Sequence, residues 1–247
     1  MNPFFCRIGS KRLLSNKIIK YIPEHETYVE AFAGSASVFF RKDKAKKNIL
    51  NDLDKNLIDG YRLLKKASSN PEDYNIQNGA KNIQNFVDNV SLNNSIEDRL
   101  LQKLYLMCDT FSGYNKKIFA PKANSQKRKI DKIQDYKNKL KNTTITNKDY
   151  KSIIKKYDNE KTFFFLDPPY EKSVEQNVYE HGSMDFEEFK NILDEIDGYF
   201  LLTINDSPYI RRLFKDYVIV PIKVKASGNF AIGGKDRNEL LIMNYEL

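Results

Sequence analysis

Two apolar patterns alternate along the 247-residue chain, and together they predict an α/β fold. Short runs with few polar residues are typical of strands that are buried in a sheet. Segments with an apolar residue at every third or fourth position are typical of helices that pack on one face. The short runs predict strands at 27–32, 48–50, 162–166 and 199–204. The longer spacing predicts helices at 9–21, 55–66, 96–108, 185–196 and 208–214, and a further helix is expected at 38–42, after a turn of small residues.

The last two predicted strands, 217–225 and 239–245, should form an antiparallel hairpin. The segment between them contains three glycines and has no room for the crossover helix that a parallel pair needs. The sheet is therefore expected to be mixed.

A sharp end to the apolar run Thr162–Leu166 marks the first candidate site. Asp167 follows the run directly, and two prolines then end the strand, because each fixes φ and neither supplies an N–H donor. The Asp167 carboxylate is thereby expected at the carboxyl end of a buried strand, where ligands bind in open α/β sheets. An ordinary turn after a strand is the alternative interpretation.

The chemistry of this stretch suits the exocyclic amino group of a base. The Asp167 oxygens and the Pro168 carbonyl are all acceptors, so together they can hold two N–H donors. Holding both hydrogens favours a nitrogen lone pair that points outward, and it stabilises the positive charge that develops on the nitrogen during attack. The Tyr170 ring can stack on the face of the base. We therefore expect Asp167, Pro168 and Tyr170 to be catalytic.

A second candidate site follows the first predicted strand. The small residues 33–37 form a turn of the kind that lets a ligand approach the backbone. Gly34 is the only glycine there, so the G-x-G-x-x-G dinucleotide fingerprint is absent and a nicotinamide enzyme is disfavoured. Asp52, 18 residues later, ends the next strand, where an acidic side chain accepts ribose hydroxyls. Helix capping is the alternative for Asp52, and capping is what we expect of Asp54.

Arg7 and Lys11 flank a tight entry, Gly9-Ser10, at the start of the first predicted helix. Backbone amides at such an entry, together with the helix dipole, can receive a carboxylate or a phosphate. The alternative, which the local pattern favours, is a plain start of a surface helix.

The charge distribution adds a polyanionic partner to this picture. The formal net charge is +8, and residues 115–151 alone hold twelve Lys and Arg against three Asp, so the positive excess belongs to this segment. Aromatic residues lie among its lysines, as expected of a surface that follows phosphates. A solvated lysine-rich face is the alternative.

Few residues are available for other chemistries. His25 and His181 are the only histidines, so a zinc site or a Ser/His triad is not expected. Cys6 and Cys108 are the only cysteines and are far apart, so we expect no disulfide framework and no Cys/His metal cluster. The N-terminus has no signal-peptide core and no run is long enough to span a membrane, which makes a reducing, cytoplasmic compartment the simplest expectation.

The order of these motifs resembles that of the Dam-like family of adenine-N6 DNA methyltransferases. Ile8–Lys11 is similar to the family's opening G-G-K motif, and Phe32–Ala36 is similar to its F-x-G-x-G turn. Asn51-Asp52 matches its acidic end of the second strand, and the D-P-P-Y sequence of Asp167–Tyr170 matches its catalytic tetrapeptide.

The resemblance implies a Rossmann-like methyltransferase fold with a mostly helical inserted DNA-recognition domain. The catalytic domain would comprise residues 1–66 and 160–247, and the recognition domain would comprise residues 67–159. The implied cofactor is S-adenosyl-L-methionine and the implied partner is double-stranded DNA. We expect no metal, no membrane, and a monomer or weak dimer. The cofactor-binding residues that the resemblance implies are Arg7, Lys11, Phe32, Gly34, Asp52 and Asp167.

The reaction that the resemblance implies is in-line methyl transfer to N6 of an adenine flipped out of the duplex. Ser35 and Ala36 depart from the family, since they stand where glycines are expected. Two alternatives stay open: an enzyme that methylates RNA or a protein glutamine, and a non-catalytic DNA-binding relative. Restriction-modification is one setting for a DNA methyltransferase of this kind.

Overall fold

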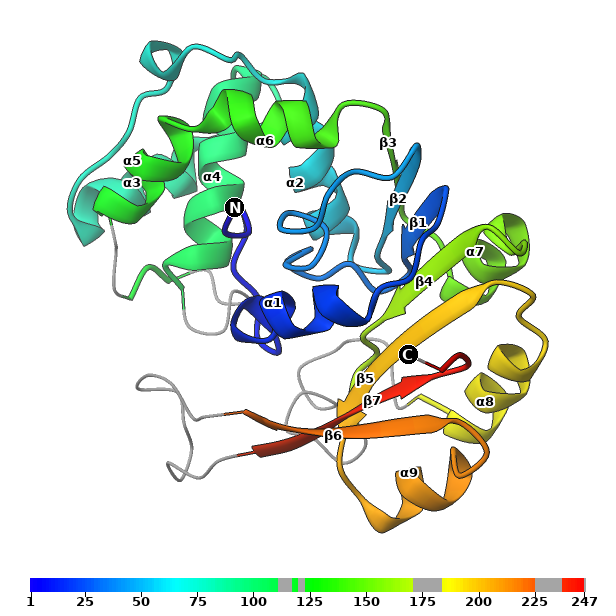
Figure 1. Cartoon of the computed structure of the whole chain (residues 1–247). Helices are drawn as coiled ribbons and strands as arrows, with labels where there is room; N and C mark the ends of the chain where they lie inside the picture. Colours follow the sequence, from blue (N-terminus) through cyan, green and yellow to red (C-terminus); the bar gives the residue numbers. More distant parts are fainter. Residues whose placement is uncertain (111–116, 120–122, 171–183, 225–236, 247) are drawn as a thin grey trace. The chain divides into compact units, whose positions relative to one another are not determined.

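The computed structural model describes residues 1–110, 117–119, 123–170, 184–224 and 237–246. These residues fall into two compact units. Figure 1 shows the chain coloured along its sequence. The first unit comprises Met1–Arg12, Gly34–Lys44 and Asp52–Asn147, and the second comprises Leu13–Ala33, Ala45–Asn51 and Lys148–Leu247. Residues 225–236, which join the last two strands, lie outside the described residues. The assignment of residues 67–159 as a recognition domain stays a prediction.

A mixed sheet is the frame of the second unit. Four of its strands, β2, β1, β4 and β5, run parallel in that order, and β7 pairs antiparallel with both β5 and β6. The predicted Rossmann-like α/β fold with a C-terminal antiparallel hairpin is confirmed. The strands are β1 (Thr27–Glu30), β2 (Lys47–Asn51), β4 (Thr162–Leu166), β5 (Tyr199–Asn205), β6 (Val218–Val224) and β7 (Arg237–Met243).

The carboxyl ends of the central parallel strands meet at one edge of this sheet. Glu30 of β1 lies opposite Phe165 of β4, and Leu166 of β4 lies opposite Leu202 of β5. Every residue of β4 is buried, as the apolar run predicts. Side chains that follow β1, β4 and β5 are therefore presented side by side.

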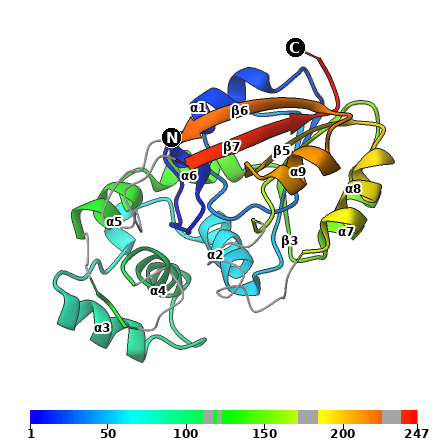
Figure 2. The ribbon, with the colours of Figure 1, turned by 90° about the horizontal axis from the view of Figure 1, so that it is seen from below.

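Three helices cover one face of this sheet (Figures 1 and 2). They are α7 (Tyr150–Tyr157), α8 (Phe186–Asp194) and α9 (Pro208–Leu213). Their apolar side chains share one core cluster with alternate residues of the strands, including Leu166, Leu202 and Ile204. Alternation along a strand sends the residues between these to the other face. The short helices α1 (Ser15–Ile18) and η2 (Ile19–Tyr21) replace the single predicted helix at 9–21, together with η1 (Lys11–Leu13).

The first unit is mostly helical. Helices α2 and α4 match the predicted ranges, and Asp54 and Ser95 cap them by accepting from the amides of Leu57 and Asp98. The N-terminal Phe4 and Phe5 are fully buried in this unit. Its elements are α2 (Lys55–Lys66), η3 (Pro71–Asp73), α3 (Ala80–Asn89), α4 (Ile96–Cys108), α5 (Ala123–Ile130), α6 (Ile133–Leu140) and β3 (Thr143–Thr146).

The helix predicted at 38–42 is wrong, because this segment forms turns. Three consecutive side chains, Val38, Phe39 and Phe40, are all buried. A helix that lies on a surface cannot bury three consecutive side chains, since they point about 100° apart. The run of apolar residues at this place indicates burial and not helical periodicity.

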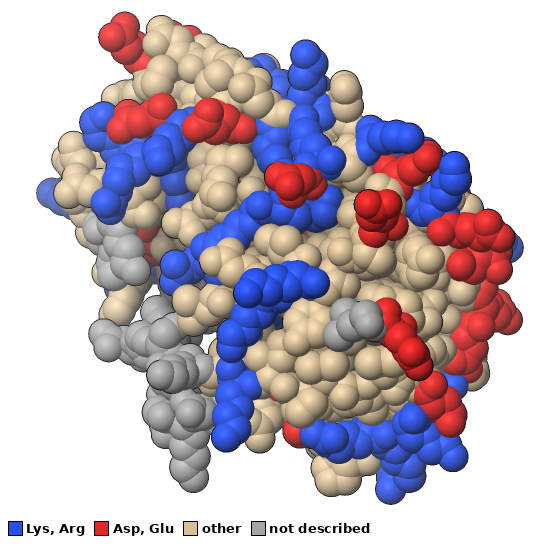
Figure 3. Space-filling view, in the orientation of Figure 1, with Lys and Arg blue, Asp and Glu red and all other residues tan. Residues whose placement is uncertain are grey.

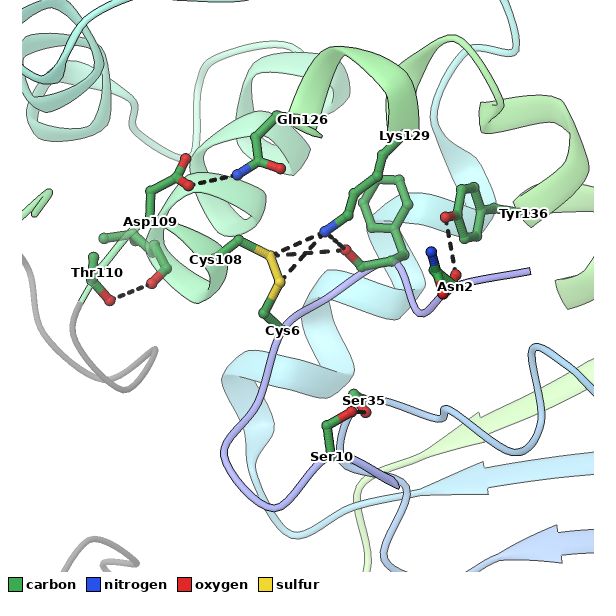
Figure 4. Close-up of a disulfide and its surroundings, with 12 residues drawn as sticks. Asn2, Cys6, Ser10, Ser35, Cys108, Asp109, Thr110, Gln126, Lys129 and Tyr136 are labelled. Atoms are coloured by element: carbon green, nitrogen blue, oxygen red, sulfur yellow. Dashed lines mark hydrogen bonds between the residues drawn. A yellow bond between two sulfur atoms is a disulfide. The ribbon is translucent and has the colours of Figure 1, made fainter. Parts of the chain in front are cut away.

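Cys6 and Cys108 form a disulfide in the first unit, across a sequence separation of 102 residues (Figure 4). Their Cα atoms lie 4.9 Å apart, which suits such a bond. This corrects the expectation that distance along the chain keeps the two cysteines unpaired. The fold brings the end of α4 to the N-terminal segment, so the cysteines no longer argue for a reducing compartment.

No helix among the described residues is long and apolar enough to cross a membrane.

Candidate active site

The turn at Gly34 is held from two sides within the first unit. Its amide donates to Asp52 Oδ2 at 2.8 Å, and its carbonyl accepts from the Tyr61 hydroxyl at 2.9 Å. Gly34 has a φ of +47°, a conformation that side chains disfavour, and a Cβ added there would meet nothing within 4 Å. The backbone conformation therefore favours glycine at this position, and the space beside it is open.

Ala36 keeps the backbone shape that the family's second glycine would allow. Its φ is 51°, in the left-handed region that favours glycine. Its methyl group is fully buried. Alanine therefore occupies a backbone conformation that glycine also adopts.

Three serine hydroxyls tie the N-terminal entry to this turn. Ser10 Oγ lies 2.7 Å from Ser35 Oγ and 2.8 Å from Ser37 Oγ, and the last two are 2.7 Å apart. Ser35 and Ser37 are buried. Sequence reasoning missed this cluster, since single serines carry no spacing signal.

Asp52 lies against the turn, as the sequence predicts. Its Oδ2 accepts from Gly34 and its Oδ1 accepts from the Asp54 amide at 2.9 Å. Burial raises the pKa of the Asp52 carboxyl, while these two amides and the nearby Arg7 charge counteract part of the rise. The result is a carboxylate whose two oxygens are held by backbone amides beside the Gly34 turn, and its role in binding a ribose stays a prediction.

Arg7 and Lys11 lie in the same unit, with different surroundings. The largely buried Arg7 side chain forms an ion pair with Asp54, the residue that also caps α2. Lys11 is buried, and its ammonium donates to the Gly9 carbonyl at 2.9 Å. Arg7 thus lies beside Asp54, whereas Lys11 stabilises the Gly9-Ser10 entry.

Asp167 stands at the carboxyl end of β4 in the second unit. It is partly exposed, and Pro168 after it is buried. Its Oδ1 accepts from the Thr203 hydroxyl at 2.8 Å. Tyr170 is partly buried and packs against the core cluster. The carboxylate therefore reaches solvent at the sheet edge while one oxygen is held by the neighbouring strand.

Phe32 and Asp167 lie at the same level of the sheet edge. Glu30 is aligned with Phe165, and Phe32 and Asp167 each come two residues after their member of this pair. The Phe32 ring is partly buried and lies 5.1 Å from the Tyr150 ring, centroid to centroid. The predicted site residues thus form two groups, one in each unit: Arg7, Lys11, Gly34 and Asp52 in the first, and Phe32, Asp167, Pro168 and Tyr170 in the second.

The basic segment uses part of its charge to hold the first unit together. Lys137 and Lys139 donate to the carbonyls of Ala67 and Lys42. Lys129 Nζ donates to the Phe4 carbonyl at 2.8 Å. Basic side chains appear over α5 and α6 with acidic ones between them (Figure 3).

Comparison with known proteins gives a family match over most of the chain. Residues 8–227 match the D12 class N6 adenine-specific DNA methyltransferases. Two relatives are both type II methyltransferases. M.CviBI from Paramecium bursaria Chlorella virus NC1A is 25% identical over 229 residues, which cover 88% of each chain. M1.LlaDCHI from Lactococcus lactis subsp. cremoris is 23% identical, covering 99% of this chain and 96% of the relative.

Solved structures give only a distant likeness. An rRNA methylase from Streptococcus thermophilus covers 95% of this chain and 95% of its own, with a TM-score of 0.38 and 8% identity. A precorrin 8w decarboxylase from Methanobacterium thermoautotrophicum covers all of both chains, with a TM-score of 0.42 and 10% identity. These likenesses are too weak to identify the fold, which follows from the strand order of the sheet.

Proposed function

Because the chain belongs to the D12 class N6 adenine-specific DNA methyltransferase family, we propose that it transfers the methyl group of S-adenosyl-L-methionine to N6 of an adenine in duplex DNA. The chain is a DNA methyltransferase by family, and the cofactor, the base and the chemistry are the proposal. The observation that supports it most is the Asp167 carboxylate, fixed at the carboxyl end of β4 by the Thr203 hydroxyl.

The residues around Gly34 suit the cofactor. Its sulfonium supplies an activated methyl group with a neutral leaving group, so no acid is needed. Asp52 would accept from the ribose hydroxyls, and the open space at Gly34 would admit the methionine part close to the backbone. Arg7 would hold the acidic strand end in place through its ion pair with Asp54. The family resemblance also assigns Phe32 to the cofactor.

Asp167 and Pro168 would activate the target amine. The carboxylate oxygen and the Pro168 carbonyl would each accept one hydrogen of the amino group. The nitrogen lone pair would then point away from both acceptors, which is the orientation that attack on a methyl group needs. As the N–C bond forms, positive charge grows on the nitrogen, and the fixed carboxylate stabilises it without having to reorganise. Tyr170 would stack on the extruded base, a contact worth about 1–3 kcal/mol.

An adenine within a duplex cannot reach Asp167, so the base has to flip out. Unpairing and unstacking cost a few kcal/mol. Contacts between the basic segment and phosphates would offset part of this cost and would make binding dependent on salt.

Methyl transfer from labelled S-adenosyl-L-methionine to equal amounts of duplex DNA, RNA and protein tests the proposal. We expect label in duplex DNA alone, on adenine N6. Asp167→Asn keeps the shape but removes the negative charge, and should lower the turnover at least 100-fold. Asp216→Asn, an exposed aspartate in the same unit, is the matched control and should leave turnover unchanged. Label in RNA or in a glutamine side chain would replace the proposed substrate, and an active Asp167→Asn variant would refute the role of Asp167.

A further inference from the structure

We propose that Thr203 is a positioning residue that orients the Asp167 carboxylate, an inference that rests on the proposed function. Thr203 lies in the middle of β5 and is fully buried. Its neighbours Leu202 and Ile204 point into the core cluster under α7, α8 and α9, so Thr203 belongs to the opposite face of the sheet. A hydroxyl at such a place is destabilising unless it has a hydrogen-bond partner.

The register of β4 and β5 provides that partner. Leu166 lies opposite Leu202, so Asp167 follows directly opposite Thr203. The Thr203 hydroxyl donates to Asp167 Oδ1 at 2.8 Å and lies 3.5 Å from the Leu166 carbonyl. It has one hydrogen to give, and the nearer, charged acceptor forms the stronger bond. The bond therefore goes to the carboxylate.

This bond fixes more than one oxygen. A carboxylate is planar, so holding Oδ1 also sets the direction of Oδ2. Without this bond the carboxylate would lose one of the contacts that restrain its side-chain torsions, and more ordering would be needed during the reaction. The Thr203 hydroxyl supplies that restraint before the substrate arrives, which is the condition for preorganised electrostatic stabilisation.

Thr203 acts through Asp167, so its effect should appear in turnover and not in binding. Thr203→Val keeps the shape of the side chain and removes the hydroxyl, whereas Thr203→Ser keeps the hydroxyl. Thr162→Val is the matched control: Thr162 is also fully buried, lies at the other end of β4, and donates to the Tyr157 carbonyl at 2.7 Å. The control also replaces a fully buried threonine by valine, but at the amino end of β4, away from Asp167.

The experiment measures kcat, KM for duplex DNA, cofactor affinity and melting temperature for the wild type and the three variants. We expect Thr203→Val to lower kcat about 10- to 100-fold with KM and cofactor affinity within threefold of the wild type. Thr203→Ser should restore kcat to within about threefold, and Thr162→Val should lower the melting temperature without lowering kcat.

Wild-type kcat in Thr203→Val, or equal losses in the Val and Ser variants, would overturn the positioning role. If Thr203→Val does not fold, Thr203→Ala with the same readouts decides in its place. A wild-type protein that methylates no DNA would overturn the proposed function and this inference with it. An active wild type with unaffected Thr203→Val would overturn this inference alone.

We also infer that the Cys6–Cys108 pair is a redox-responsive clamp on the cofactor side of the first unit. The ammonium of Lys129 lies 3.5 Å from Cys6 Sγ and 3.2 Å from Cys108 Sγ (Figure 4). A cation beside a thiol favours the thiolate, the form that attacks a disulfide or a peroxide. Cys6 is exposed, so small oxidants and reductants can reach it.

Both chain neighbours of Cys6 are linked to the groups that hold the Gly34 turn, one of them through an intermediate residue. Arg7 forms the ion pair with Asp54, whose amide donates to Asp52, the acceptor of the Gly34 amide. The Phe5 ring packs edge-on against the Tyr61 ring at 5.1 Å between centroids, and Tyr61 donates to the Gly34 carbonyl. The disulfide therefore restrains the segment on which the geometry of the proposed cofactor site depends.

The chemical step is the oxidation of two thiols by hydrogen peroxide. The two sulfurs lose two electrons and form one S–S bond, while the O–O bond breaks and its two oxygens, with the two thiol protons, leave as two water molecules. A dithiol reverses the step by thiol–disulfide exchange.

Cofactor affinity, measured by calorimetry with S-adenosyl-L-methionine after peroxide or dithiothreitol treatment, tests the clamp, with free thiols counted in each sample. We expect two free thiols and at least threefold weaker binding in the reduced protein. Cys108→Ser should bind as the reduced protein does under both treatments. Equal affinity in both states would overturn the clamp while leaving the proposed function intact, and no binding in either state would count against the cofactor itself.

Discussion

At the residue scale, the proposed function depends on carboxylates whose oxygens are held by neighbours before any ligand binds. Asp52 accepts from two backbone amides, and Asp167 accepts from a threonine hydroxyl. Such carboxylates have little freedom to lose when they bind a hydroxyl or an amine. The same restraint makes each of them sensitive to small changes in its partner.

Asp52 gives a prediction about pH. Because burial raises its pKa in the folded state, the folded protein holds the Asp52 proton more tightly than the unfolded chain does. Its contribution to stability is therefore fully present at acidic pH and is lost as pH rises through the folded-state pKa. Asp52→Asn cannot ionise, but its amide nitrogen can no longer accept from one of the two backbone amides. The melting temperature of the variant relative to the wild type should therefore rise with pH, because only the wild type loses stability as its carboxyl ionises.

Melting curves of the two proteins, recorded from about pH 4 to about pH 8, measure this effect. A difference that does not change with pH would contradict the assigned environment. The same variant should bind the cofactor more weakly, which separates the stability role of Asp52 from its binding role.

The turn gives a prediction about two small residues. Gly34→Ala forces a side chain into a left-handed conformation and should destabilise the protein by about 1–2 kcal/mol. Ala36→Gly relieves the same strain but loses a buried methyl group, worth about 0.8 kcal/mol, and should be close to neutral. Urea unfolding of the two variants measures the contrast, and equal destabilisation would refute it.

The sequence predicts residues whose role depends on their near neighbours in the chain. It does not predict residues whose role depends on contacts between distant segments. Asp167 is recognisable because two prolines follow it, and Asp52 because of its distance from Gly34. Thr203 becomes important only through the register of β4 and β5. Ser10 and Ser35 meet only after the chain has folded.

At the element scale, helices with a capping residue were placed well and the segment after the Gly34 turn was not. Asp54, Ser95 and Ser207 each cap a helix whose range the sequence predicts. A cap lies within three residues of its partner, so the sequence contains it. The apolar run Val38–Phe40 is buried, and Phe40 packs against the rings of Tyr61 and Tyr136, which a local pattern cannot report.

The helix α5 gives a prediction about charge. Lys127 and Arg128 are exposed, and so is Lys132 after the helix, whereas Lys137 anchors α6 to the Ala67 carbonyl. Neutralising the three exposed residues to Gln should weaken DNA binding and make its dependence on salt shallower. The log–log slope should fall by about 0.9 for each phosphate that the protein no longer neutralises. Affinities at several salt concentrations measure the slope.

Two controls bracket this result. Lys155→Gln and Lys156→Gln on α7 change exposed lysines outside that group and should leave the slope unchanged. Lys137→Gln should lower the melting temperature because it removes an anchoring hydrogen bond. A wild-type slope in the triple variant would mean that α5 does not bind phosphate.

At the scale of the whole molecule, the sequence predicts the mixed sheet because its strands carry their own apolar signal. The hairpin of β6 and β7 was predictable from the lack of room for a crossover helix. The disulfide was not, since its two cysteines are joined only by the packing of the first unit. The positive excess of residues 115–151 stays the best sequence-level argument for a polyanionic partner.

The central claim is that a carboxylate at the end of β4 directs methyl transfer to adenine N6. The most direct measurement is the N6-methyladenine content of DNA from a host that lacks its own adenine methylation, expressing either the wild-type chain or Asp167→Ala, read by mass spectrometry of nucleosides. The account predicts N6-methyladenine with the wild type and none with the variant. No N6-methyladenine with the wild type, or equal amounts with both proteins, would contradict it.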